Sequence, residues 1–189
     1  MSPAGICDCA KEGGSPLTNV PALVDGETVI TVVRSRHQLY RDETGIWRLS
    51  HSAFRREDIE AKKKGKSVSL MRETIIPCDE VTRRAMALSQ DSDLAGGPLV
   101  AKASALKLRT ISSAIFTKCV CLYADPITAE EAKATGDPLG ECLGHASLKK
   151  HCTFSGANNP EAWGNLISDL ADAFEGALHV LTGSAASFE

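Results

Sequence analysis

The sequence predicts an α+β domain in which a single mixed or antiparallel sheet packs against a long C-terminal amphipathic helix. Residues 28–33 form a β-branched run after the turn residues Asp25 and Gly26, which indicates a strand. Residues 119–123 are apolar at nearly every position, a pattern typical of a buried strand. Apolar residues recur at helical spacing across residues 159–182, which predicts the helix that covers the sheet.

Length and composition predict one folded domain over residues 24–189. The hydrophobic share is 43% and the charged share is 24%, which excludes general disorder. Residues 1–23 hold several Gly and Pro and few large apolar groups, so we expect a flexible N-terminal arm. The first residues lack a secretory pattern and no run is long enough to span a membrane, so we expect a cytoplasmic protein.

Charge and cysteine content argue against two further classes of protein. A net charge of −3 provides no basic field, so bulk nucleic-acid binding is disfavoured. Seven cysteines, an odd number without regular spacing, are expected to be reduced thiols rather than a disulfide framework.

The elements between the first strand and the last helix follow from shorter patterns. Residues 47–54 are read as an extended segment and residues 67–71 as a strand. Asp79 is expected to cap a helix that runs to about residue 90, on the same face of the sheet as the last helix. Residues 99–108 fit a strand or a helix equally well.

The last helix has a complete start signal. Asn159 is a capping residue, and Pro160 occupies the first helical position. We expect its apolar stripe to cover the sheet, and a dedicated partner-binding helix is the alternative.

Two cysteines and two histidines lie within a dozen residues, which raises the question of a zinc site. Cys142, His145, His151 and Cys152 are suitable zinc ligands. In an extended strand, however, the two histidines fall on one face and the two cysteines on the other. We therefore expect no metal and no other cofactor, and we keep these four residues as an alternative site.

Hydroxyl groups cluster in two short segments. Ser50 and Ser52 share one face of their segment if it is extended, Ser67 and Ser69 share one face of theirs, and Arg72 follows. If the two segments pair, these groups line a pocket for a phosphate or a ribose. The alternative is that they face solvent.

Histidine is the expected acid–base residue of such a pocket. His145 and His51 lie in extended segments from which a side chain can reach a cleft, so they are the candidate catalytic residues. The candidate ligand-binding residues are Ser50, Ser52, Ser69 and Arg72. A structural histidine is the alternative at both positions.

Four short boxes resemble a loose group of small, uncharacterised bacterial proteins. The boxes are residues 48–55 (RLSHSAFR), 67–69 (SVS), 125–126 (DP) and 144–146 (GHA). The group carries an Arg-x-x-Ser-x-Ala-Phe-like box, a Ser-Val box, and a late Asp-Pro followed by a Gly/Ala-His-Ala box. The resemblance implies that these boxes converge in space, and it implies no particular reaction.

Three classes of function follow. No catalytic signature is complete, so the sequence does not decide whether the chain is an enzyme. We expect an accessory or interaction protein of a bacterial multi-protein system, which binds a protein partner. The first alternative is a small enzyme or ligand-binding domain that acts on a phosphate- or ribose-bearing molecule. The second alternative is a zinc-binding protein.

Overall fold

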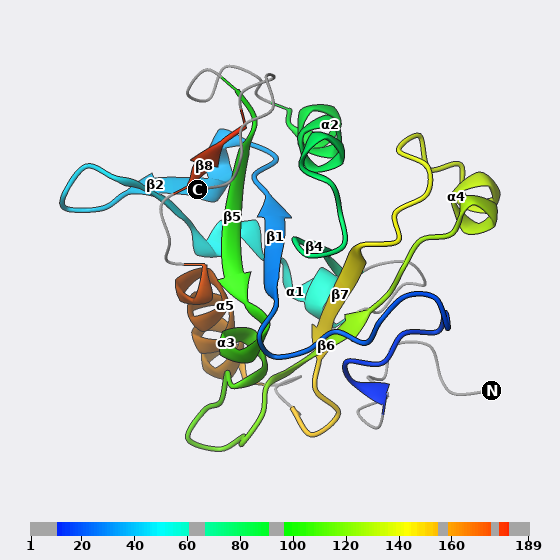
Figure 1. The fold of residues 1–189 in the computed structure, drawn as a ribbon. Coiled ribbons are helices and arrows are strands. Elements are labelled where there is room, and N and C mark those ends of the chain that lie inside the picture. The colour runs from blue at the N-terminus through cyan, green and yellow to red at the C-terminus, as the bar shows by residue number, and fades with distance from the viewer. Residues whose placement is uncertain (1–10, 61–66, 91–96, 155–158, 175–177, 182–189) are drawn as a thin grey trace.

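A six-stranded antiparallel sheet forms the centre of the molecule, as the computed structural model shows (Figure 1). The structure describes residues 11–60, 67–90, 97–154, 159–174 and 178–181. The strand order is β6-β7-β4-β1-β5-β8. The strands are β1 (Thr28–Val32), β4 (Val68–Arg72), β5 (Leu99–Ser104), β6 (Val120–Ala124), β7 (His145–Lys150) and β8 (His179–Val180). The predicted α+β class is confirmed, and the sheet is antiparallel.

A separate two-stranded hairpin and five α-helices complete the described part of the chain. The hairpin consists of β2 (Leu39–Arg41) and β3 (Trp47–Leu49), flanked by the 3-10 turns η2 (Arg36–Gln38) and η3 (His51–Ala53). The helices are α1 (Arg56–Ile59), α2 (Cys78–Leu88), α3 (Ala105–Arg109), α4 (Ala129–Thr135) and α5 (Pro160–Ala173). In this part of the molecule no helix is long and apolar enough to cross a membrane.

The two faces of the sheet support two separate cores. Neighbouring residues of β1 belong to different clusters, Val29 to the larger and Ile30 to the smaller, because side chains alternate along a strand. Helix α5 packs into the larger cluster through Leu166 and Leu170. Helix α2 packs into the smaller one through residues that include Val81. The expectation that both helices cover the same face is wrong.

Helix α5 begins as predicted and ends earlier. The Asn159 side chain accepts a hydrogen bond from the Ala162 amide at 3.1 Å, and Pro160 follows in the first turn. The helix ends at Ala173, whereas the sequence predicts helix to about residue 182. Residues 179–180 instead pair with β5 at the edge of the sheet, because the apolar residues near the C-terminus fit a short strand as well as a helix.

Two of the predicted segments change structure at a serine. Residues 99–108 contain both a strand and a helix, which meet where Ser104 accepts a hydrogen bond from the Lys107 amide. The segment 47–54 is extended only through Leu49, where Ser50 caps a 3-10 turn. Serine competes for backbone hydrogen bonds in this way and so often begins a turn.

Residues 11–23, which we expected to belong to a flexible arm, lie against the body. The Gly13 amide donates to the carbonyl oxygen of Leu122 in edge strand β6, and Leu23 is buried in the larger core. Residues 1–10 of the expected arm lie outside the described part. The segment is poor in apolar groups, but long-range contacts hold it: Val20 and Leu23 are buried, and Glu12 forms ion pairs with Lys118 and Arg109.

Candidate functional site

A cavity of about 180 Å³ lies between the sheet and helix α2. Its polar wall includes Ser69 and His145, and Arg34 and Arg84 also line it. Strand β1 pairs with β5 along its whole length but with β4 at only two positions, Val29 with Arg72 and Ile30 with Met71. The registered pairing of β1 and β4 thus ends at Ile30 and Met71, next to the residues of both strands that line the cavity.

Strand register brings Ser69 and His145 together. On β4 and β7, Ser69 pairs with Ser147 and Met71 pairs with His145. Ser69 and His145 are therefore diagonal neighbours on the same face, a separation that a histidine side chain can bridge. Two adjacent strands of the sheet therefore supply both side chains.

The hydrogen bonds of His145 determine which of its nitrogens carries the proton. Nδ1 lies 2.6 Å from the carbonyl oxygen of Asp125, which only accepts hydrogen bonds, so Nδ1 carries a proton. Nε2 lies 2.7 Å from Ser69 Oγ. In the neutral imidazole Nε2 is an acceptor, and the Ser69 hydroxyl donates to it. This is the arrangement of a nucleophilic hydroxyl and its base, with a carbonyl in the place of the usual carboxylate.

Burial keeps His145 in the neutral form. Burial lowers the pKa of the imidazole below its ordinary value of 6.5, although the hydrogen bond to the Asp125 carbonyl acts in the opposite direction. Nearby Arg84 and Lys149 lower the pKa further. At neutral pH the Nε2 lone pair is therefore available to accept a proton.

A chain of hydroxyl groups fixes Asp125 from the other side. The Ser147 hydroxyl donates to the Asp125 carboxylate at 2.5 Å, and Ser147 also contacts Ser67 at 2.8 Å between hydroxyl oxygens. The Asp125 amide donates to the carbonyl oxygen of His145. Both the side-chain carboxylate and the backbone amide of Asp125 are thus held in place. These contacts fix the position of the Asp125 carbonyl group that orients the imidazole.

Arg84 is fixed over the cavity by other contacts. Its Nε donates to Glu80, and its Nη2 donates to the carbonyl oxygens of residues 139–141. Within the described part of the chain Nη1 is the one guanidinium nitrogen for which we find no partner. A fixed positive group at the edge of a cavity stabilises negative charge that develops there.

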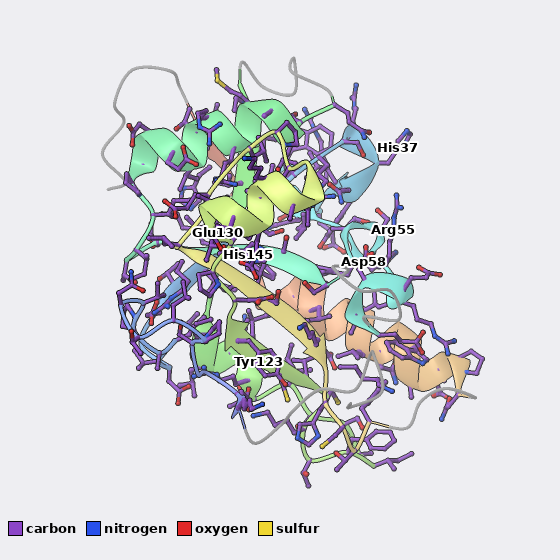
Figure 2. The ribbon with its side chains drawn as sticks, turned by 90° about the vertical axis from the view of Figure 1, so that its right-hand side faces the viewer. His37, Arg55, Asp58, Tyr123, Glu130 and His145 are labelled. Atoms are coloured by element: carbon purple, nitrogen blue, oxygen red, sulfur yellow. The ribbon has the colours of Figure 1, made fainter. Side chains whose placement is uncertain are left out.

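The other predicted site residues lie elsewhere. Ser50 accepts from the Ser52 amide, Ser52 donates to the carbonyl oxygen of His37, and His51 is exposed on the same turn. Figure 2 shows His37 and Arg55 along one border of the view, away from His145. The structure thus brings Ser69 and His145 together and leaves Ser50, His51 and Ser52 on a separate surface.

Arg72 does not line the cavity. It is buried, with 1% of its surface exposed, and its guanidinium donates to Glu27 and to the carbonyl oxygens of Pro21 and Ala22. It lies on the opposite face of β4 from Ser69, because the two positions differ by an odd number of residues. The expected pocket formed by both serine segments and Arg72 is therefore not the one observed.

The four alternative zinc ligands do not converge. Cys142 is buried in the smaller core beside the cavity, whereas His151 and Cys152 follow the far end of β7. The six residues from His145 to His151 span roughly 20 Å in a strand. In the part of the chain that the structure describes, no group of three or more His, Cys, Asp or Glu side chains is arranged to hold a metal ion.

None of the cysteines that the structure describes forms a disulfide; they are Cys78, Cys119, Cys121, Cys142 and Cys152. Burial raises the pKa of the Cys142 thiol, so this neighbour of the cavity is neutral and unreactive. Cys7 and Cys9 lie outside the described residues.

Sequence reasoning missed three contributors to the site. The Asp125 carbonyl has no side-chain signal, although Asp125 belongs to one of the short boxes. Ser147 and Arg84 stand in a strand and a helix, and nothing in their local pattern distinguishes them from ordinary residues. Only the register of β7 with β4 and β6 and the packing of α2 reveal them.

Comparison with protein family models, with curated proteins and with solved structures finds no match. The resemblance to small bacterial proteins therefore stays a prediction.

Proposed function

We propose that the chain is a small enzyme in which Ser69 and His145 act as nucleophile and base on a small molecule that carries a phosphate or a similar anionic group. The observation that carries the proposal is the 2.7 Å contact between Ser69 Oγ and His145 Nε2 at the wall of a cavity. The proton on Nδ1 and the lowered pKa of His145 support it, because both leave Nε2 ready to accept a proton.

In the proposed reaction Ser69 Oγ attacks an electrophilic carbon or phosphorus atom, and its proton moves to His145 Nε2. The imidazolium then gives this proton to the leaving group, and a covalent intermediate remains on Ser69. Water, deprotonated by the same nitrogen, releases the product and restores the hydroxyl. Arg84 Nη1 stabilises the negative charge of the transition state.

Arg34 supports the choice of an anionic substrate. It is exposed and lines the cavity with Ser69, and no described residue forms an ion pair with its side chain. Asp137 is the acidic residue among the lining side chains, so the two arginines leave an excess of one positive charge. The cavity volume suits a compact molecule rather than a polymer.

A serine-reactive fluorophosphonate probe tests the nucleophile. We expect one probe molecule per chain, located on Ser69 by peptide mass spectrometry, and no labelling of Ser69→Ala. The matched control is Ser52→Ala, because Ser52 is also an exposed serine but contacts a backbone carbonyl instead of an imidazole. Labelling of Ser69→Ala at the wild-type rate, or no labelling of folded wild-type protein, contradicts the proposal.

A thermal-shift panel of nucleoside monophosphates and sugar phosphates tests the substrate class. We expect at least one compound to raise the melting temperature of the wild type and to lose this effect in Arg34→Ala. A stabilising compound that acts equally on both proteins binds elsewhere. The expectation of an accessory protein with a protein partner stays a prediction.

A further inference from the structure

Arginines are concentrated in the segment that contains the small hairpin. Residues 34–49, hereafter the arginine hairpin, hold four of the ten arginines and none of the eleven lysines. Their two acids are Asp42 and Glu43, and Asp42 forms an ion pair with Arg48 at 2.9 Å. The hairpin is thus net positive in a chain whose net charge is −3.

The hairpin has a fixed shape and projects from the body (Figure 1). Its turn is organised by Asp42, which accepts hydrogen bonds from the Thr44 hydroxyl, from Arg48 and from the Thr44 and Ile46 amides. The bonds from Thr44 and Arg48 hold the pKa of Asp42 far below its usual range. Gly45 has a φ of 82°, a left-handed conformation that suits glycine. A partner therefore meets a preformed surface.

Aromatic and aliphatic groups are exposed between the arginines. Tyr40 is 48% exposed and Ile46 is 45% exposed. The guanidinium groups of Arg36 and Arg41 lie 5.8 and 4.7 Å from the centre of the Trp47 ring. A cation–π contact of this kind helps to hold a guanidinium group in place over the ring.

We propose that the arginine hairpin is a docking surface for an acidic face of a partner protein. Arginine, tyrosine and tryptophan are the side chains that dominate protein interfaces, whereas lysine is depleted there, and the hairpin has this composition. The guanidinium group of Arg41, held over the Trp47 ring, is suited to form paired hydrogen bonds with a carboxylate. A long nucleic acid is less suited, because the rest of the chain is net negative and repels a polyanion.

Selection of random 16-residue peptides displayed on phage, with the full chain as bait, tests this surface. We expect the selected peptides to be enriched in Asp and Glu relative to the library. They should bind Arg36→Ala/Tyr40→Ala/Arg41→Ala about tenfold or more weakly than the wild type, as loss of interface arginine and tyrosine side chains does. Binding of the best peptide should also fall steeply between 50 and about 500 mM salt.

Two further variants and one nucleic-acid control make the outcome decisive. Lys107→Ala/Lys133→Ala removes two exposed positive charges outside the hairpin and should leave the affinity unchanged. Arg41→Lys keeps the charge and removes the paired hydrogen bonds, so it should weaken binding even where the triple variant does not fold. The control on nucleic acid is a fluorescein-labelled oligothymidylate of 20 nucleotides.

The proposal is overturned if the selected peptides have no excess of acidic residues. It is also overturned if the wild type and both hairpin variants bind the selected peptides equally well. Tighter binding of the oligothymidylate than of the best peptide, lost in the same variants, assigns the surface to nucleic acid instead. None of these outcomes depends on Ser69 or His145, so the proposed enzyme and the docking surface are tested separately.

Discussion

Arg72 and Glu27 form a buried ion pair joined by two hydrogen bonds. Arg72 Nε lies 2.8 Å from one carboxylate oxygen of Glu27, and Nη2 lies 2.6 Å from the other. Burial alone would raise the pKa of Glu27, but hydrogen bonds from Arg72, the Val24 amide and Thr74 outweigh it, and the pKa lies below the usual value. The pair fixes residues 21–27 against β4 and occupies the arginine that the sequence suggests for ligand binding.

Replacement of Arg72 by methionine is expected to lower the free energy of unfolding by about 3–5 kcal/mol, because the Glu27 carboxylate is then buried without its partner. The double variant Arg72→Met/Glu27→Met should recover part of this loss, since no charge is left unpaired. Urea unfolding followed by circular dichroism measures both. The control is Arg83→Met, whose exposed ion pair with Glu80 should contribute little to stability. Similar losses for Arg72→Met and Arg83→Met would contradict the prediction.

Gly144, the residue before His145, is expected to tolerate no side chain. A Cβ atom there would lie 3.0 Å from Ile76 Cβ and 3.2 Å from the Ile76 backbone nitrogen. Gly144→Ala should therefore lower the free energy of unfolding by about 1–3 kcal/mol through overpacking. Gly26→Ala is the matched control, because nothing lies within 4 Å of a Cβ atom at that position. Equal melting temperatures of Gly144→Ala and the control would contradict the prediction, because the strand would then accommodate the Cβ atom without loss of stability.

The pH dependence of stability follows from His145. Its pKa in the folded chain lies below 6.5, so the unfolded chain binds the proton more tightly and stability falls as pH drops from about 6.5 through the folded pKa. His145→Asn should reduce this slope, because asparagine does not titrate and still offers a donor to the Asp125 carbonyl. The pKa of His179 is lowered as well, so part of the slope should remain. Urea titrations between pH 5 and about 7.5 measure the slope, and an unchanged slope in His145→Asn would be the contrary result.

The sequence predicts local structure well where one signal dominates. Asn159 and Pro160 begin α5 as expected, and the strand expected at residues 67–71 is β4. The end of α5 is predicted poorly, because the spacing of apolar residues is satisfied both by a helix and by a short strand at His179. Ser50 belongs to a turn rather than to a strand because its side chain caps that turn, an outcome that alternation alone does not reveal.

The site is predicted only in part for a related reason. His145 and Ser69 are identified from residue type, and their meeting depends on the register in which Ser69 pairs with Ser147. A shift of one residue in this register would turn one of the two side chains to the opposite face. For Arg72 the prediction from residue type is wrong. It follows a serine box in the sequence, but it is buried in an ion pair on the opposite face of its strand.

The pH profile of labelling distinguishes a Ser69 that is activated by His145 from a Ser69 that merely bonds to it. The fluorophosphonate reacts with the hydroxyl only as the proton is removed, so the labelling rate should be constant at neutral pH and fall as His145 becomes protonated. Because the pKa of His145 is lowered, the midpoint of this fall should lie below 6.5. His145→Asn should label about a hundredfold more slowly, the loss typical for a general base, and without this acid limb. Ser67→Ala is the control, since Ser67 contacts Ser147 rather than His145 and its removal should leave the midpoint in place. If His145→Asn labels at the wild-type rate with the same profile, the contact between Ser69 and His145 serves only to join the two strands.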